Sequence, residues 1–493
     1  MNDEPLLCAT VAAPTMGEMR AARDAADADL IELRLDKVDH PDVAAALDGR
    51  RRPVIVTCRA QWEGGGFRGS EEERLRILEA ALAGGAEYID IEAAAGFTSD
   101  LIRAHGGRRI VVSRHDFEAP PKDVEAMYRH VRSLGAEISK LAVAVDTLSE
   151  SLPLFALAHG TPEPHVLLAM GPAGLPSRAL AGRLGNRWTY VGDGVAPGQI
   201  PADRMLRHLQ FRRIRPDATL YGVVGKPIGH SRSPIMHNAG FAALDLNAAY
   251  LPLEAATAAD VVSFAKTLSL GGLSITAPFK VPLMASVDEI EPIARRVGAI
   301  NTIVNRSGRW FGANTDVGGF LAPLTNRIPL RGLRATILGG GGSARAVAIA
   351  LADSGAQVTI SARRGDSASE VADLVGGRTE VFPPPPGTWD LLVNTIPASS
   401  VPAGASPMGL TPLDGRMVYD LVYEPEETTL LSDARAAGCD TIGGLEMLVA
   451  QAERQFELWT GQRPPEGIFA TAARSAVSVR TAGSSSRIPT HTL

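Results

Sequence analysis

Short apolar runs alternate with helix-length segments from residue 6 to about residue 210. Eight such runs each open one unit: LLCATVA, LIELRL, PVIVTCR, EYIDIE, RIVVSRH, EISKLAV, HVLLAM and RWTYVG. The units repeat every ~25 residues, and β-branched runs joined by helical crossovers are typical of a parallel sheet covered on one face. The pattern predicts an α/β fold that begins with a (β/α)8 TIM barrel over residues 1–212.

The alternation starts again with LYGVVG, after the charged linker FRRIRPDA (211–218). In residues 334–364, a strand, a glycine-rich turn, a helix and a second strand follow one another, which is the opening of a Rossmann dinucleotide-binding fold. We therefore expect a two-lobed module, with one lobe over 218–322, completed by 446–475, and a Rossmann domain over 323–445. The polar, Ser-rich segment 476–493 is expected to be a disordered tail.

Composition narrows the class of function. The net charge is −6 with both signs scattered, and no basic run carries interleaved aromatic residues, which argues against a nucleic-acid surface. Three distant cysteines suit neither a disulfide framework nor metal ligation, so we expect a reducing compartment and no metal. No apolar run reaches about 18 residues, and a strand-like run follows MNDEP directly. A cytoplasmic protein that acts on small molecules, away from membranes, is the expectation.

Polar side chains fall in or just after the ends of the predicted barrel strands. Because such barrels build their active sites at the C-terminal ends of the strands, these residues are candidates for one site. They are Glu32, Arg34, Arg59, Glu92, His115, Lys140 and Met170. Any one of the charged residues could be a solvated loop residue, but their recurrence on six strands favours a site.

Lys140 lies in the middle of the strand-like segment AEISKLAVAV (136–145). Only six of the 49 Lys and Arg residues are lysines, so arginine meets the general need for positive charge. A lysine on an apolar strand is a candidate for a task that arginine cannot perform, which is to lose its proton and attack a carbonyl. The alternative is a lysine that extends from the strand end to water.

The turn GGGGSARA predicts a dinucleotide site. Gly339 permits the tight turn, Gly341 lets backbone N–H groups approach a pyrophosphate, and Ala344 replaces the third glycine. The second strand is followed by two arginines instead of the acid that binds an NAD ribose, which favours NADP(H); the alternative is two exposed arginines in an arginine-rich chain. The candidate cofactor-binding residues are Gly339, Gly340, Gly341, Gly342, Ser343, Ala344, Ala362, Arg363 and Arg364.

Hydroxyl and amide side chains gather in four segments of the preceding lobe, which are VVGKPIGHSRSPIMHN (223–238), GGLSITAPFK (271–280), GAINTI (298–303) and GANTDVGG (312–319). Such groups can bind the hydroxyls of a sugar-like acid, and the candidates are Ser231, Ser233, Thr276, Asn301 and Thr315. Lys280 and Asp316 are candidates for a proton-transfer pair beside a hydride acceptor. The alternatives are a surface lysine and an ordinary turn aspartate.

From about residue 219 to 475, the chain resembles shikimate dehydrogenase. The resemblance rests on GHSRSP, T-x-P-x-K, INT, NTD and GGGGSARA, then on YDLVYEPEETTLL (419–431) and GGLEMLVAQAERQFELWTG (443–461). It implies that Lys280 and Asp316 are the catalytic pair and that Arg363 and Arg364 lie over the NADP phosphate. It also implies that shikimate is held by Ser231, Ser233, Thr276, Asn301, Asp316 and Gln451, with Tyr423 and Met447 lining the cleft. Ser274 departs from the asparagine common in the family, although plant-type members are similar to this chain there.

From about residue 5 to 210, the chain resembles type I 3-dehydroquinate dehydratase. The motifs are IELRLD (31–36), TCRAQWEGG (57–65), YIDIE (88–92), VVSRHDF (111–117), SKLAV (139–143), AMGPAGLPSR (169–178) and APGQI (196–200). The resemblance implies a Schiff base at Lys140, His115 as general acid/base and Glu63 orienting its imidazole. It implies substrate binding by Glu32, Arg34, Arg59, Arg178 and Gln199. Val195 stands where the family usually has serine or threonine, so we expect weaker substrate binding.

Together the two resemblances imply consecutive chemistry, in the order and fusion of the bifunctional plant enzymes. A lyase would dehydrate 3-dehydroquinate to 3-dehydroshikimate, and an NADPH-dependent oxidoreductase would reduce this to shikimate, in the pathway to chorismate and aromatic amino acids. Two alternatives remain: a second module acting on quinate or with NAD, or a ligand-sensing regulator with dead catalytic sites. The presence of Lys140, His115, Lys280 and Asp316 argues against the regulator, and the oligomeric state stays open.

Overall fold

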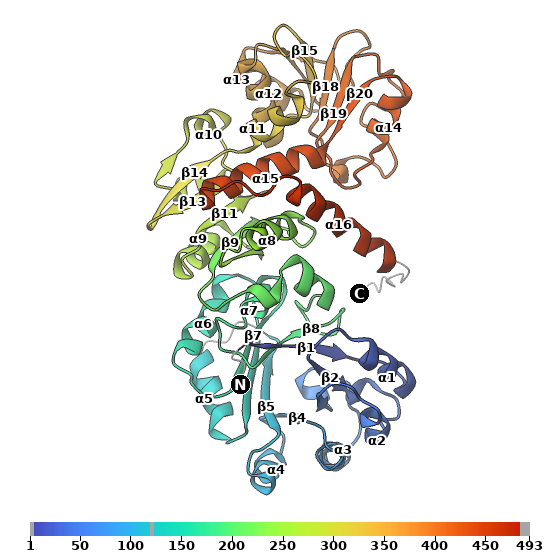
Figure 1. The fold of residues 1–493 in the computed structure, drawn as a ribbon, viewed down its shortest axis with the longest axis vertical. Helices are drawn as coiled ribbons and strands as arrows, with labels where there is room; N and C mark the ends of the chain where they lie inside the picture. Colours follow the sequence, from blue (N-terminus) through green and yellow to red (C-terminus); the bar gives the residue numbers. More distant parts are fainter. Residues whose placement is uncertain (1–3, 119–122, 484–493) are drawn as a thin grey trace. The chain divides into compact units, whose positions relative to one another are not determined.

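The computed structural model describes residues 4–118 and 123–483, with side chains described as far as residue 475. The chain divides into two compact units, Met1–Pro234 with Asn247–Leu270 and Ile235–Leu246 with Gly271–Leu493. Figure 1 labels the elements of both units. The boundaries expected from the sequence, at residues 212, 218, 322 and 445, stay a prediction.

The first unit contains an eight-stranded parallel sheet in the order β7-β6-β5-β4-β3-β2-β1-β8. Asn186, just before β8, brings the two ends of the sheet together, because its side-chain amide bonds both the N–H and the C=O of Leu167 on β7. The predicted barrel is confirmed, as a nearly closed one. Its strands are β1 (Leu6–Val11), β2 (Leu30–Arg34), β3 (Val54–Thr57), β4 (Tyr88–Glu92), β5 (Ile110–Asp116), β6 (Ile138–Ala144), β7 (His165–Met170) and β8 (Trp188–Val191).

Helices follow the first seven strands and surround the sheet (Figure 1). They are α1 (Met16–Ala25), α2 (Val43–Leu47), α3 (Glu71–Ala83), α4 (Thr98–His105), α5 (Val124–Ser133), α6 (Leu152–His159) and α7 (Leu175–Ala179). The sequence GSEEER starts α3 with a capping box, in which Ser70 and Glu73 satisfy each other's backbone N–H groups. After β8, a π-helical turn, Arg204–His208, stands where the eighth helix was expected.

The first unit also holds β9 (Thr219–Gly225) and β10 (Ala248–Glu254), which pair in parallel, and α9 (Ala258–Thr267). Asp260 in the first turn of α9 accepts hydrogen bonds from the backbone N–H groups of Leu148 and Ser149, at 3.1 and 2.8 Å. Residues after the barrel boundary expected at residue 212 therefore pack with the barrel. The hydrophobic pattern along the chain did not indicate this packing, because it carries no information on which elements contact each other.

The second unit contains a parallel sheet in the order β17-β16-β15-β18-β19-β20, which is the order of a Rossmann fold, as predicted. These strands are β15 (Arg334–Leu338), β16 (Gln357–Ser361), β17 (Arg378–Glu380), β18 (Leu391–Asn394), β19 (Met417–Asp420) and β20 (Asp440–Gly443). The helices are α12 (Gly342–Asp353), α13 (Gly365–Val375) and α14 (Thr429–Ala436). Alanine and valine on α12 are buried in the core of this sheet, which lets the helix lie close to it.

The remaining strands of the second unit are β11 (Gly272–Ile275), β12 (Glu289–Ile290), β13 (Thr302–Arg306) and β14 (Arg309–Ala313), and β13 pairs antiparallel with both β11 and β14. The remaining helices are α8 (Ser233–Ala243), α10 (Pro292–Val297), α11 (Asp316–Leu321), α15 (Gly444–Thr460) and α16 (Ile468–Gly483). Because α16 runs to Gly483, it enters the segment expected to be a tail, and residues 484–493 lie outside the described residues.

Candidate active sites

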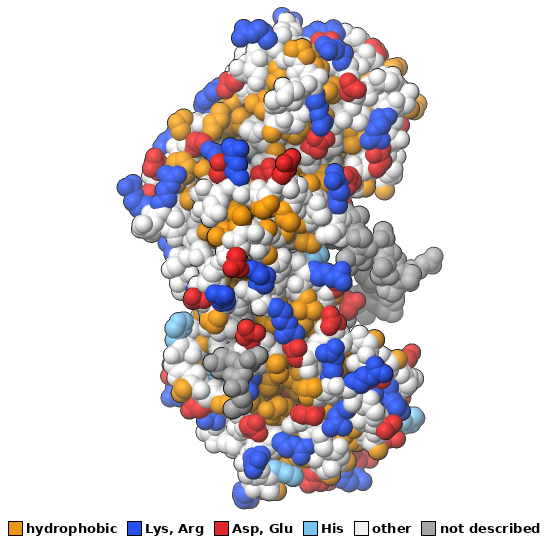
Figure 2. All heavy atoms as spheres, viewed as in Figure 1, with side chains coloured by type: hydrophobic (Ala, Val, Ile, Leu, Met, Phe, Trp, Pro, Cys, Tyr) orange, Lys and Arg blue, Asp and Glu red, His pale blue; other side chains and the backbone are white. Residues whose placement is uncertain are grey.

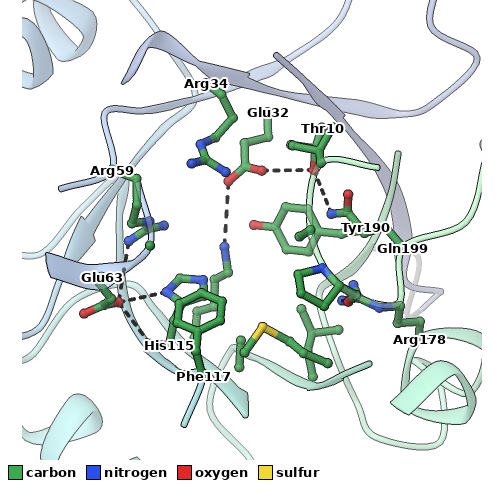
Figure 3. A pocket seen from close by; sticks show the side chains of 18 residues that line it. Thr10, Glu32, Arg34, Arg59, Glu63, His115, Phe117, Arg178, Tyr190 and Gln199 are labelled. Atoms are coloured by element: carbon green, nitrogen blue, oxygen red, sulfur yellow. Dashed lines mark hydrogen bonds and ion pairs between the residues drawn. The ribbon is translucent and has the colours of Figure 1, made fainter. Parts of the chain in front are cut away.

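One cavity of the barrel is lined by the eight residues that the dehydratase resemblance assigned to it (Figure 3). Of the further candidates at the strand ends, Met170 lines the cavity too, whereas Glu92 does not, because its carboxylate is buried against Arg74 and the backbone N–H of Ala60. Figure 3 shows Glu63 and His115 on one side and Thr10, Glu32 and Gln199 on the other. The eight residues are Glu32, Arg34, Arg59, Glu63, His115, Lys140, Arg178 and Gln199. The full lining comes from six barrel strands, β1, β2, β5, β6, β7 and β8, from the segments after β3, β5 and β8, and from α7.

Lys140 is the third of the seven residues of β6, which agrees with its place in the middle of the apolar segment. Its side chain is 5% exposed, and its Nζ lies 2.9 Å from Oδ2 of Asp90 and 3.7 Å from Oε1 of Glu32. Nζ also lies 4.3 Å from the ring centroid of Tyr190, within cation–π distance. The snorkelling alternative is wrong, because the ammonium points into the cavity.

Asp90 is the central carboxylate of the site, and the sequence analysis missed it. Its side chain is fully buried and accepts hydrogen bonds from Lys140 at 2.9 Å, Arg59 at 2.7 Å and the hydroxyl of Ser113 at 2.6 Å. Burial works to raise the pKa of Asp90, but the charges of Arg59 and Lys140 hold that pKa well below its usual range. The segment YIDIE carried a clue, since residues two apart on a strand share a face, which places Asp90 and Glu92 together.

His115 and Glu63 form the second reactive pair of the cavity. Oε1 of Glu63 lies 2.8 Å from Nδ1 of His115 and accepts the backbone N–H of the same residue at 2.9 Å. Burial, with repulsion from Arg59 and Lys140, lowers the pKa of His115 well below its usual value. Burial raises the pKa of Glu63 to about 7, against the opposing charge of Arg59. The imidazole is therefore neutral near pH 7 and can act as a base.

Arg178 brings a buried positive charge with few partners to the cavity. Nη2 donates to the carbonyl of Pro197 at 3.1 Å, whereas Nε and Nη1 have no hydrogen-bond partner among the described residues. Burial lowers the pKa of this guanidinium to about 10. A buried, largely unpaired guanidinium is suited to a carboxylate ligand, because such a ligand offers two oxygens at matching spacing.

Thr10 connects two predicted binding residues and was also missed by the sequence analysis. Its hydroxyl donates to Glu32 at 3.0 Å and accepts from the side-chain amide of Gln199 at 3.1 Å. Gln199 lies in the loop after β8, so this contact joins the loop to the first two strands. A lone threonine in LLCATVA offers no clue to such a role.

In the second unit, Lys280, Asp316 and Asn301 form one connected group. Nζ of Lys280 donates to Oδ2 of Asp316 at 2.7 Å, and the amide of Asn301 donates to Oδ1 at 2.8 Å. Asp316 is 8% exposed and begins α11, where a carboxylate is favoured by the helix dipole. The predicted proton-transfer pair is therefore in direct contact.

Gln451 and Thr315 extend this group. The Thr315 hydroxyl donates to Oε1 of Gln451 at 3.4 Å and accepts from Asn301 at 2.9 Å. Gly319 allows the approach of α11 to α15, since a Cβ there would lie 2.6 Å from Cβ of Gln451. Gly319, the second glycine of NTDVGG, thus has a packing reason, whereas a Cβ on Gly318 would meet no atom within 4 Å.

The other predicted residues of this module are placed less directly. Thr276 follows β11 and Tyr423 follows β19, both half-buried, while Met447 packs against the Rossmann core. Ser231 and Ser233 lie after β9 in the first unit, where Oγ of Ser231 accepts the backbone N–H of Ser233 at 3.2 Å. Substrate binding by Ser231, Ser233, Thr276 and Tyr423, and cofactor binding by Met447, stay predictions.

Ser274 leads to a further buried residue, Gln455, that the sequence analysis did not single out. The Ser274 hydroxyl donates to Oε1 of Gln455 at 2.7 Å. The Gln455 amide donates to the carbonyl of Asn301 at 3.1 Å and to the hydroxyl of Thr302 at 3.0 Å. Gln455 therefore supports the backbone that carries Asn301.

The glycine-rich turn has the geometry of a pyrophosphate site. Gly339 has φ of +110°, which favours glycine, and a Cβ on Gly340 would lie 2.7 Å from the carbonyl oxygen of Ser367. Gly341 caps α12 without a side-chain hydrogen bond, so the first N–H groups of this helix are available to an anion. Arg363 and Arg364 are exposed, between the end of β16 and the start of α13. These features fit NADP.

Three observations bear on other classes of function. Among the described residues, no group of three or more His, Cys, Asp and Glu side chains is arranged to hold a metal ion, and Cys8, Cys58 and Cys439 are free and buried. None of the helices in the described part of the chain has the length and apolar character needed to cross a membrane. Figure 2 shows positive and negative side chains interspersed over the viewed face.

Comparison with known proteins identifies the family. Residues 7–216 match the model for type I 3-dehydroquinase, 223–303 that for the shikimate dehydrogenase substrate binding domain, and 444–474 that for the shikimate 5'-dehydrogenase C-terminal domain. A chloroplastic bifunctional 3-dehydroquinate dehydratase/shikimate dehydrogenase of Arabidopsis thaliana is 31% identical over 95% of this chain and 84% of its own length.

Two further relatives cover the second module and the whole chain, respectively. Shikimate dehydrogenase (NADP(+)) of Bacillus cereus is 37% identical over 50% of this chain and 94% of its own length. A solved structure of dehydroquinate dehydratase and shikimate dehydrogenase from S. pombe is 25% identical, covers 97% of this chain and 99% of its own, and has a TM-score of 0.45. The protein belongs to the family of bifunctional 3-dehydroquinate dehydratases/shikimate dehydrogenases.

Proposed function

We propose that the chain converts 3-dehydroquinate to shikimate in two steps, with a Schiff-base dehydration in the barrel followed by NADPH-dependent reduction in the second module. The observation that carries the proposal is the cavity that buried Lys140 lines together with His115 and Arg178, while Asp90, behind the lining, accepts a hydrogen bond from Lys140 at 2.9 Å. The amine, the base and the carboxylate-binding cation that this dehydration needs therefore share one site.

In the barrel, the Lys140 amine attacks the substrate ketone, and loss of water gives an iminium that withdraws electrons from the adjacent carbon. Neutral His115 then removes the proton on that carbon and returns it to the departing hydroxyl, which leaves as water. Hydrolysis of the product iminium restores the amine. Asp90 and Glu32 supply negative charge beside the cationic nitrogen, and Arg178 holds the substrate carboxylate.

In the second module, bound NADPH supplies hydride to the carbonyl of 3-dehydroshikimate. Lys280 and Asp316, 2.7 Å apart, provide the proton that the carbonyl oxygen needs, and Asn301 fixes the carboxylate. Thr315 and Gln451 offer donors and acceptors for ring hydroxyls. The helix start at Gly341 is suited to the pyrophosphate, and Arg363 and Arg364 to the 2′-phosphate.

A coupled assay tests both steps together. With 3-dehydroquinate as the only substrate, NADPH oxidation is expected, because the barrel makes the ketone that the second module reduces. Borohydride added with 3-dehydroquinate should attach the substrate mass to the Lys140 peptide. An unmodified Lys140 peptide in an active preparation would rule out the Schiff base. Reduction of NADP+ with quinate but not with shikimate, or oxidation of NADH but not of NADPH by 3-dehydroshikimate, would favour the alternative dehydrogenases.

We also propose a cytoplasmic location. Three unpaired, buried cysteines support a reducing compartment. Expression of a tagged chain in its host, followed by fractionation, tests this location against an organelle such as that of the chloroplastic relative.

A further inference from the structure

Arg74 lies on α3, behind the barrel cavity, and is not among the residues that line it. Its side chain is 0% exposed and forms ion pairs with Glu92 on β4 and with Glu71 one turn earlier. Its guanidinium also lies over the ring of Phe97, 4.8 Å from the centroid. The carboxylates of Glu92 and Glu71 and the ring of Phe97, in the turn before α4, thus surround one cation. The ring of Trp62, in the turn Gln61–Glu63, lies 5.9 Å from the same guanidinium.

Glu92 joins Arg74 to the loop that carries Glu63. One carboxylate oxygen of Glu92 binds Arg74, and the other accepts the backbone N–H of Ala60 at 3.1 Å. Ala60 begins the turn Gln61–Glu63, and its carbonyl accepts the N–H of Glu63 at 3.1 Å. The carboxylate therefore anchors the first residue of a turn whose last residue binds the imidazole.

The loop has little room to compensate for a lost anchor. A Cβ on Gly65 would lie 2.0 Å from the carbonyl oxygen of Arg59, so the chain folds back on itself directly after the turn. The carbonyls of Ala60 and Arg59 accept the N–H groups of Gly65 and Phe67, at 2.9 and 3.3 Å. A shift of Ala60 would therefore be transmitted to the whole turn.

We propose that Arg74 is a positioning residue for dehydration, which acts through Glu92 on the Gln61–Glu63 turn so that Glu63 orients His115. The inference rests on the proposed dehydratase function. Arg178 and Gln199, two of the residues expected to hold the substrate, lie on other elements. Arg59, a third, pairs with Glu92 at 3.3 Å but is also held by Asp90 at 2.7 Å, a contact that does not involve Arg74. Loss of Arg74 therefore slows proton transfer and leaves substrate binding and iminium formation in place.

The test is the Arg74→Gln variant of the full chain. Its kcat for dehydration is expected to fall on the order of 10- to 100-fold, with KM within about twofold, because a small misplacement of a catalytic group costs rate. Borohydride should still label Lys140 in the presence of 3-dehydroquinate. Arg74→Lys, which keeps the charge beside Glu92, should recover part of kcat. In the double variant Arg74→Gln/Glu92→Gln, the loss of kcat should not exceed the loss in the more affected of the two single variants.

Arg76→Gln is the matched control, since Arg76 lies on the same helix, is exposed and is expected to leave kcat unchanged. NADPH oxidation by 3-dehydroshikimate reports the amount of folded second module in each variant. The inference is overturned if Arg74→Gln keeps kcat within twofold, if KM rises as much as kcat falls, or if neither Arg74 variant traps the iminium. If borohydride failed to label Lys140 in the parent protein, the proposed Schiff-base function itself would be contradicted.

Discussion

Nζ of Lys280 lies 2.7 Å from Oδ2 of Asp316, and Asn301 holds the other oxygen of that carboxylate. Removing the ammonium in Lys280→Ala deletes the group that would give its proton to the carbonyl oxygen. NADPH oxidation by 3-dehydroshikimate should fall by roughly 100- to 10,000-fold, the usual contribution of a positioned acid. Steady-state kinetics with NADPH at saturation measures this loss.

Dehydration by the same variant is the control, because Lys280 and the barrel cavity belong to different compact units. We expect an unchanged rate of 3-dehydroshikimate formation. Equal loss of both activities would mean that the two reactions have been assigned to the wrong modules.

Arg178 should contribute to function at the expense of stability. In the substrate-free protein its charge is buried, and its only hydrogen-bond partner among the described residues is the Pro197 carbonyl, so Arg178→Met should stabilise the barrel by about 1 kcal/mol or more. The same change should raise KM for 3-dehydroquinate by roughly 100-fold, because the substrate carboxylate loses its cation. Urea unfolding without substrate and initial-rate kinetics give the two quantities.

The Arg178→Lys variant separates charge from shape, since it keeps a buried cation and should not be stabilised. A substrate-free Arg178→Met protein that is less stable than the parent, with KM unchanged, would show that this arginine is only part of the packing.

Val195 lies in the cavity wall beside Pro197, where a hydroxyl could reach the substrate. Val195→Ser adds one hydrogen-bonding group, which is worth on the order of 1 kcal/mol, so KM for dehydration should fall about fivefold. Val195→Ala, which removes the same methyl groups without adding a hydroxyl, is the control. Equal KM values for the two variants would show that the position makes no polar contact.

The hydrophobic pattern predicted the barrel sheet and the Rossmann sheet because each strand and helix carries its own periodicity. The cavity residues were predicted from the family motifs, because a motif identifies side chains without any information on the distances between them. Asp90 was missed because its role depends on distances between residues in the fold, which a motif does not give. Its importance comes from Lys140 and Arg59, which lie 50 and 31 residues away in the sequence and meet it only in the folded barrel.

Gln455 was missed for a related reason. On α15 its amide is an ordinary helix residue, and its partners Ser274 and Asn301 lie 181 and 154 residues away. The mid-strand place of Lys140 could be read from the sequence, but its contacts with Asp90 and Tyr190 could not, because these lie on other strands of the barrel.

His237 on α8 is fully buried among aromatic rings, with centroids 5.1 Å from those of Trp459 and Phe469. Burial lowers its pKa from 6.5 to about 3. The unfolded chain therefore takes up a proton near pH 6.5 while the folded chain does not, so this contribution to stability is complete above pH 6.5 and is lost as the pH falls toward 3. Between pH 7 and pH 5 the loss is about 2 kcal/mol.

Replacing His237 by phenylalanine should remove this loss, because the ring remains and the proton site does not. Hydrogen exchange of the α15 amides, corrected for the intrinsic rate, gives the free energy of opening at pH 7 and at pH 5. The parent should lose about 2 kcal/mol more than the variant over this range, whereas His105→Gln, at the exposed end of α4, should behave like the parent. If parent and His237→Phe lost the same free energy, the buried imidazole would not be the group that titrates.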